Sequence, residues 1–315
     1  ALVSRPNMDP RDPYKNRGAE NQMVLPHIPG SIFKTVIAAA ALDEGLASFK
    51  TMFDCSKKID GITRDKEHDY GMLDLTDSFA VSCNNAFATL GKKLIQHDSD
   101  AFETYAEKLG LYPMAGWEGT VYREEQFRQF PEERKGTIWH DRHDKQVPLA
   151  VAQTAIGQKD VRVSPLGVAN MMATIARGGE ALKVRAVDQV LYKNGTTLFS
   201  FSPEPATNQE PLAPKTVQQL QQLLRGVVTK EEGTGRRFRS LPYAVAGKSG
   251  TAETGKTDDE GELINKWFAG YFPVDRPKYA LVVVELDRPN GRTVTNDVFA
   301  AAVETLYAYD KNEQG

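Results

Sequence analysis

Apolar residues recur at helical spacing through the middle of the chain. Residues 31–45 carry apolar side chains on most sides of the helix that they predict, which is typical of a buried helix, and Gly45 can end it. Residues 214–230 keep their apolar side chains on one face and begin with a proline, as an amphipathic helix does. The same spacing predicts shorter helices over residues 75–82, 85–96, 98–110, 148–157 and 165–177.

Strand patterns dominate the last hundred residues. Residues 244–251, 267–272 and 279–286 predict three strands. The hydrophilic stretch 254–265 between the first two predicts an exposed hairpin loop. Residues 298–309 predict a closing helix, so this part of the chain is a sheet followed by a helix.

Irregular segments separate these elements. Residues 184–201 predict a hairpin, whereas the charged, glycine-containing stretch 113–146 predicts a long loop. Residues 46–73 predict loop and short strands, with a turn at Asp60-Gly61, and residues 1–4 resemble the end of a strand. Helices in the middle and strands toward both ends predict an α+β fold rather than alternating βαβ units.

Composition narrows the function classes. The chain has 315 residues and a formal net charge of -3, so no basic excess indicates nucleic-acid binding. Two cysteines, Cys55 and Cys83, exclude a scaffold built on disulfides but leave open whether this pair is free or bonded. No cluster with metal-ligand spacing is visible, and no cofactor or metal is expected. No apolar run reaches the length of a membrane span.

Three short motifs carry candidate chemistry. Ser31-Ile32-Phe33-Lys34 fits S-x-x-K, Ser82-Cys83-Asn84 fits S-x-N, and Lys248-Ser249-Gly250-Thr251 contains K-[ST]-G. A serine hydroxyl needs a neighbouring base to become a nucleophile, and residues three apart on a helix share a face. The lysine can act as that base when burial and nearby positive charge favour its neutral form. The motifs predict acyl transfer through Ser31, activated by Lys34, with Lys248 as the nearby charge.

These motifs, in this order, resemble the penicillin-binding protein transpeptidases. The resemblance extends over nearly the whole chain. It includes the segments Leu2-Val3-Ser4-Arg5-Pro6, Pro29-Gly30-Ser31, Ile156-Gly157-Gln158 and Trp267-Phe268-Ala269-Gly270-Tyr271. It implies an antiparallel sheet of about five strands flanked by helices, with an all-helical subdomain. It also implies that residues 1–315 form one transpeptidase domain, cut from a longer membrane-anchored chain at the outer face of a bacterial cytoplasmic membrane.

The resemblance also implies roles for individual residues. Ser31 would be the acylated nucleophile, Lys34 the general base and Ser82 a proton relay, while Lys248 shapes the electrostatics. Asn84 would bind the substrate peptide. Ser249 and Thr251, on either side of Gly250, would hold the donor's terminal carboxylate. The backbone N–H groups of Ser31 and Thr251 would form the oxyanion hole. Donors would be D-Ala-D-Ala stem peptides, the acceptor an amine of a neighbouring stem, and β-lactams covalent inhibitors. Cell-wall synthesis proteins would be partners of the parent chain.

Three departures and three alternatives accompany this interpretation. Ser249 stands where threonine is common, Lys159 stands where the family usually has glycine, and Cys83 is interpreted as a small packed side chain.

A serine β-lactamase shares the fold but needs a group that activates water, and no E-x-x-L-N pattern is clear. A D,D-carboxypeptidase differs only in the acceptor. A non-enzymatic β-lactam sensor would be marked by a tethered transmembrane signalling segment, which this chain cannot show, and a role as a divisome scaffold domain could coexist with catalysis.

Overall fold

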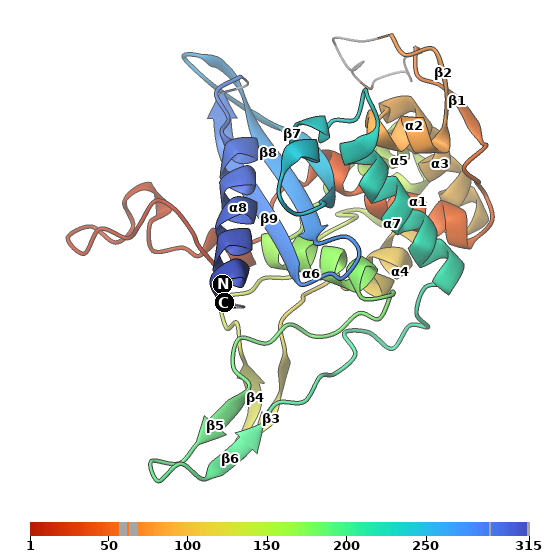
Figure 1. The fold of residues 1–315 in the computed structure, drawn as a ribbon. Coiled ribbons are helices and arrows are strands. Elements are labelled where there is room, and N and C mark those ends of the chain that lie inside the picture. Colours follow the sequence, from red (N-terminus) through yellow and green to blue (C-terminus); the bar gives the residue numbers. More distant parts are fainter. Residues whose placement is uncertain (57–61, 63–68, 290, 314–315) are drawn as a thin grey trace.

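The computed structural model describes residues 1–56, 62, 69–289 and 291–313. A three-stranded sheet lies beside a bundle of helices, and an arm of two hairpins projects from the body (Figure 1). This arrangement confirms the α+β class and the helical subdomain. The predicted turn at Asp60-Gly61 lies outside the described residues.

The main sheet consists of β7 (Ala246–Asp258), β8 (Gly261–Phe272) and β9 (Tyr279–Pro289), paired antiparallel in that order. Phe268 and Phe272 of β8 pack with α8 (Thr295–Glu313), whereas Trp267 and Tyr271 join the large core cluster that contains residues of α6 (Pro165–Ala176). Side chains alternate along a strand, so α8 and α6 cover opposite faces of the sheet.

The sheet differs from the prediction in two respects. It has three strands in the described part of the chain instead of about five, and residues 1–4 form no strand. The predicted loop 254–265 is itself strand, because β7 and β8 continue to a tight turn, with Asp258 paired to Gly261. Backbone groups make the hydrogen bonds between these strands. The side chains in this stretch are hydrophilic, so a hydropathy pattern does not reveal the strands.

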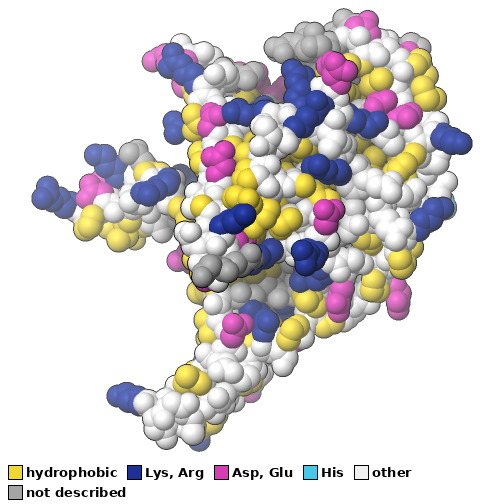
Figure 2. Space-filling view, viewed as in Figure 1, with side chains coloured by type: hydrophobic (Ala, Val, Ile, Leu, Met, Phe, Trp, Pro, Cys, Tyr) yellow, Lys and Arg dark blue, Asp and Glu magenta, His cyan; other side chains and the backbone are white. Residues whose placement is uncertain are grey.

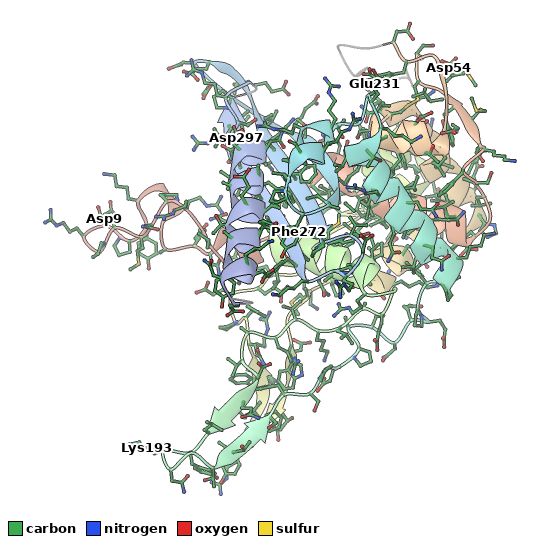
Figure 3. The ribbon with its side chains drawn as sticks, in the orientation of Figure 1. Asp9, Asp54, Lys193, Glu231, Phe272 and Asp297 are labelled. Atoms are coloured by element: carbon green, nitrogen blue, oxygen red, sulfur yellow. A yellow bond between two sulfur atoms is a disulfide. The ribbon has the colours of Figure 1, made fainter. Side chains whose placement is uncertain are left out.

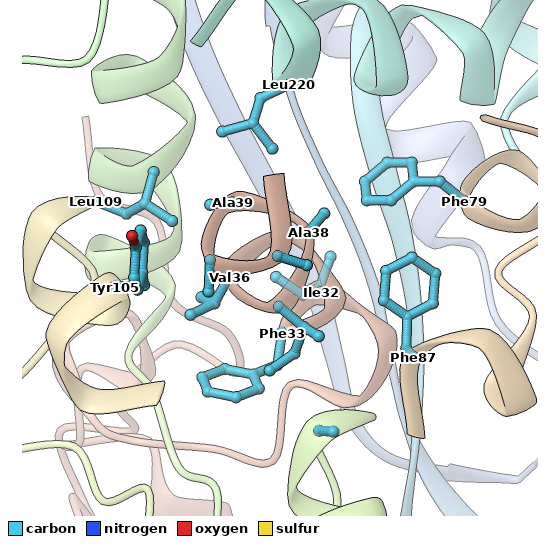
Figure 4. Packing of buried hydrophobic residues seen from close by; sticks show 14 of the residues in the cluster. Ile32, Phe33, Val36, Ala38, Ala39, Phe79, Phe87, Tyr105, Leu109 and Leu220 are labelled. Carbon is cyan, nitrogen blue, oxygen red and sulfur yellow. The ribbon is translucent and has the colours of Figure 1, made fainter. Parts of the chain in front are cut away.

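The helical subdomain surrounds α1 (Lys34–Asp43), which packs against α3 (Asn84–His97), α4 (Ala101–Lys108) and α7 (Pro214–Thr229). Every residue of α1 from Lys34 to Leu42 is buried, as the apolar pattern predicted. Phe79, Phe87, Tyr105 and Leu220 surround this helix in the core (Figure 4). The remaining helices are α2 (Leu75–Ala80) and α5 (Pro148–Ala155), and the short strands β1 (Met52–Asp54) and β2 (Met72–Asp74) precede α2.

The projecting arm contains β3 (Glu118–Val121), β4 (Glu124–Arg128), β5 (Gln189–Leu191) and β6 (Thr197–Ser200). The predicted hairpin of residues 184–201 is confirmed as β5 and β6. The prediction that residues 113–146 form a long loop is wrong in part, because this stretch contains the hairpin β3–β4. The arm stands out from the body in the space-filling view (Figure 2), and Lys193 lies at its tip (Figure 3). In the described ranges no helix is both long and apolar enough to cross a bilayer.

Candidate active site

Ser31 lies in a single 3-10 turn, Gly30–Ile32, directly before α1. The regular helix therefore begins at Lys34, three residues later than the pattern predicted. Gly30 has a φ of 53°, outside the helical region, so the chain can enter the helix only after a tight turn. Ser31 is half-buried at this turn, while Lys34 is fully buried.

Close backbone contacts hold the Ser31 turn against β7. The Gly30 N–H donates to the Gly157 carbonyl at 3.0 Å. A Cβ on Gly30 would lie 2.2 Å from the Thr251 carbonyl oxygen, and a Cβ on Gly250 would lie 2.7 Å from the Pro29 carbonyl oxygen. These contacts bring the first and third motifs together, and they require glycine at both positions.

The second motif meets the other two through its serine. Lys34 Nζ donates to Ser82 Oγ at 3.2 Å, to the Ser82 carbonyl at 2.6 Å and to Asn84 Oδ1 at 2.6 Å. Lys248 Nζ donates to the same Ser82 Oγ at 2.9 Å. Both lysine side chains are fully buried, and Ser82 itself has a φ of 64° between α2 and α3. The structure thus brings together Lys34, Ser82, Asn84 and Lys248.

The hydroxyls of the third motif contact two residues that the sequence interpretation missed. Ser249 Oγ donates to Thr234 Oγ1 at 2.8 Å, on the loop after α7. Lys266 Nζ, on β8, donates to Thr251 Oγ1 at 2.8 Å. Burial lowers the pKa of the Lys266 ammonium. No motif marks Thr234 or Lys266, and only the pairing of β7 with β8 places Lys266 opposite Thr251.

A disulfide joins Cys83 to Cys55 beside the second motif. Cys83 is buried, as predicted, and its bond fastens the segment between Ser82 and Asn84 to the end of β1. The sequence left this pairing open, since two cysteines 28 residues apart do not reveal whether they meet.

Lys159, which replaces the glycine common in the family, keeps a glycine-like backbone with a φ of 57°. Its ammonium donates to Asp144 and, at 3.1 Å, to Asp160. The neighbouring Gly157 can therefore still reach Gly30, and the substitution leaves the turn beside Ser31 in place.

Comparison with known proteins identifies the family of this chain. A model described as the penicillin binding protein transpeptidase domain matches residues 1–304. The chain belongs to this transpeptidase family. It is 26% identical over 309 residues to a peptidoglycan D,D-transpeptidase PbpA of Mycolicibacterium smegmatis, covering 94% of this chain and 56% of that protein. The chain therefore spans about half the length of such curated relatives.

Two solved structures share the transpeptidase fold. One is a ceftriaxone acyl-enzyme complex of penicillin-binding protein A from M. tuberculosis, with a TM-score of 0.75 and 24% identity over 98% of this chain and 70% of that one. The other is a peptidoglycan synthase complex that coordinates polymerization and crosslinking, with a TM-score of 0.69 and 28% identity over 92% of this chain and 48% of that one. Both likenesses agree with the predicted fold.

Proposed function

We propose that this chain is a serine D,D-transpeptidase that cross-links peptidoglycan stem peptides. The observation that carries the proposal is the convergence at Ser82, whose hydroxyl accepts from both Lys34 and Lys248 beside the turn that holds Ser31 against β7. A serine nucleophile needs a proton acceptor and a relay to the leaving group. Membership of the transpeptidase family supports the same chemistry.

The reaction has two steps. Ser31 Oγ attacks the carbonyl carbon between the two terminal D-Ala residues, and neutral Lys34 takes the hydroxyl proton. The C–N bond then breaks, a proton passes through Ser82 to the departing nitrogen, and D-Ala leaves. In the second step an acceptor amine attacks the ester carbonyl and gives up a proton. A new C–N bond forms, and Ser31 Oγ leaves and regains its proton.

The other residues bind and orient the donor. Asn84 would hydrogen-bond the stem peptide, and Ser249 and Thr251 would hold its terminal carboxylate. The N–H groups of Ser31 and Thr251 would stabilise the oxyanion, a contribution of about 3 kcal/mol for one donor. Gly250 lets β7 approach the Ser31 turn, because a side chain there would meet the Pro29 carbonyl.

The proposed location is the outer face of a bacterial cytoplasmic membrane. The disulfide supports this, because disulfides persist in oxidising compartments outside the cytoplasm. We propose that the domain acts within a longer, membrane-anchored protein that works with cell-wall synthesis proteins. The greater length of its relatives and its likeness to a peptidoglycan synthase complex support this view.

Intact-protein mass spectrometry with a labelled penicillin tests the acylation step. The wild-type protein should gain one stable adduct, and Ser31→Ala should gain none while keeping its melting temperature. Absence of an adduct on folded wild-type protein would overturn the proposal. A D-Ala-D-Ala peptide incubated with and without a D-amino acid then tests the acceptor. Exchange of the terminal residue supports a transpeptidase, whereas hydrolysis alone would indicate a carboxypeptidase, and rapid turnover of penicillin a β-lactamase.

A further inference from the structure

Lys266 occupies a place in the sheet where its ammonium faces the third motif. It lies opposite Thr251 in the pairing of β7 with β8, and its Nζ donates to Thr251 Oγ1 at 2.8 Å. Thr251 is exposed, while Lys266 is half-buried. The half-buried ammonium of Lys266 thus contacts the exposed hydroxyl of Thr251, which belongs to the candidate donor site.

In the described part of the chain no carboxylate neutralises Lys266 within ion-pair distance. Its register partner on β9 is Glu285, which turns instead to the start of α8. Glu285 Oε2 accepts from the Val294 N–H at 2.7 Å and from Thr295 Oγ1 at 2.6 Å. On the same sheet, by contrast, Lys256 of β7 pairs with Asp287 at 2.8 Å.

We propose that Lys266 is a specificity-determining residue that binds the terminal carboxylate of the acyl donor together with Thr251. The inference rests on the proposed function and goes beyond the motif residues. A charge-assisted hydrogen bond in a partly desolvated site is stronger than a bond from a neutral hydroxyl. Because Thr251 Oγ1 accepts from Lys266, its own hydrogen is directed elsewhere and can serve the same carboxylate.

This arrangement separates two tasks on the donor site. Lys34 and Ser82 transfer protons next to the charge of Lys248, whereas Lys266 and Thr251 select donors that end in a free carboxylate. A donor without that carboxylate gains nothing from the Lys266 charge. The effect of removing the charge should therefore depend on the donor, which a merely structural role would not produce.

The test uses two acyl-D-alanyl thioesters that differ only at the end, one with a free terminal carboxylate and one with a carboxamide. Acylation kinetics are measured on the wild type, Lys266→Met, Lys266→Arg and the matched control Lys256→Met. With the carboxylate donor, Lys266→Met should lower kcat/KM about tenfold to a hundredfold. With the carboxamide it should change kcat/KM less than about twofold, because no charge-assisted bond is lost. Lys266→Arg should retain most of the carboxylate rate, and Lys256→Met should alter neither.

Each contrary outcome has a distinct meaning. Equal losses on both donors would show that Lys266 supports the fold, and no loss on either would show that it does not meet the donor, so both overturn the inference while the proposed function stands. Failure of the wild type to acylate at Ser31 with either donor would overturn the proposed function instead. Lys266→Gln provides a second neutral variant if Lys266→Met melts early.

Discussion

Two constraints act on Gly30, the residue before the candidate nucleophile. Its φ of 53° lies where a residue with a Cβ is strained by about 1–2 kcal/mol. Its missing side chain also leaves room for the Thr251 carbonyl, 2.2 Å from where a Cβ would be. Gly45, at the end of α1, has a similar φ of 66° but open space around it. A comparison of substitutions at Gly30 and Gly45 therefore separates the effect of backbone strain from the effect of contact with β7.

Gly30→Ala should slow acylation of Ser31 by about a hundredfold, because displacement of the turn by about 1 Å misplaces the nucleophile relative to β7. Gly45→Ala should cost about 1 kcal/mol of stability through its φ alone and leave the rate unchanged. Labelled-penicillin acylation rates and thermal melts check both variants. Equal acylation rates in the two would contradict a role for the contact with Thr251.

At the scale of elements, one carboxylate fastens the end of α8 to the sheet. Asp310 accepts from Tyr243 at 2.6 Å, from Tyr279 at 2.7 Å and from Lys278. Hydrogen bonds from Lys278 and Tyr243 lower the pKa of Asp310 to about 2. The charged carboxylate is therefore the form that the folded protein prefers.

Asp310→Asn should lower the melting temperature most at neutral pH. The folded pKa lies below the ordinary value of 3.8, so the stabilisation is complete above that value and is lost as the pH falls toward about 2. Melting curves of the variant and the wild type should thus converge in acid. Asp297→Asn, which removes an exposed ion pair with Arg237, is the control and should change little. A difference that persists at about pH 2 would contradict the assignment.

Elements whose apolar side chains recur at a regular spacing could be predicted from the sequence. Helices α3, α6 and α7 were found because each buries a regular set of apolar positions. The hairpin β3–β4 and the outer part of β7–β8 were missed, because their exposed charged side chains give no alternation. In these strands the backbone ladder carries the structure, and hydropathy does not record it.

The candidate site shows the same division. Lys34, Ser82, Asn84 and Lys248 could be predicted because they lie in compact motifs, and their side chains meet in the structure. Ser31 shares the first of these motifs, and the backbone of Gly30 directly before it lies against β7. Thr234 and Lys266 could not be predicted, because each reaches the third motif from a segment with no motif of its own. The roles proposed for all of these residues stay predictions until acylation is measured.

At the scale of the whole molecule, the arm has a core of its own. Trp117, Phe127, Phe199 and Phe201 form a cluster separate from the large core, with the Trp117 and Phe201 ring centroids 4.8 Å apart. Trp139 instead stacks on Phe102 in the large core, at 5.5 Å. Separate clusters allow separate unfolding, since each unit loses only the contacts that it makes itself.

Trp117→Ala should therefore unfold the arm without disturbing acylation. Replacement of a buried tryptophan by alanine costs about 3–5 kcal/mol of unfolding free energy, which is more than a cluster this small can lose and stay folded. Hydrogen exchange should lose protection in β3 to β6 only, with the acylation rate of Ser31 unchanged. Trp139→Ala, the control, should lower protection in the helices around α1. Slower acylation in Trp117→Ala would show that the arm is coupled to the site.

The backbone contacts around the Ser31 turn also limit how this site can vary. Gly30, Gly157 and Gly250 each leave no room for a methyl group, because a Cβ would lie 1.9–2.7 Å from a backbone oxygen. No amino acid other than glycine fits these three positions without moving the nucleophile. Variants that reshape this site while keeping the Ser31 turn are therefore expected among side chains that reach the third motif from other segments, such as Thr234.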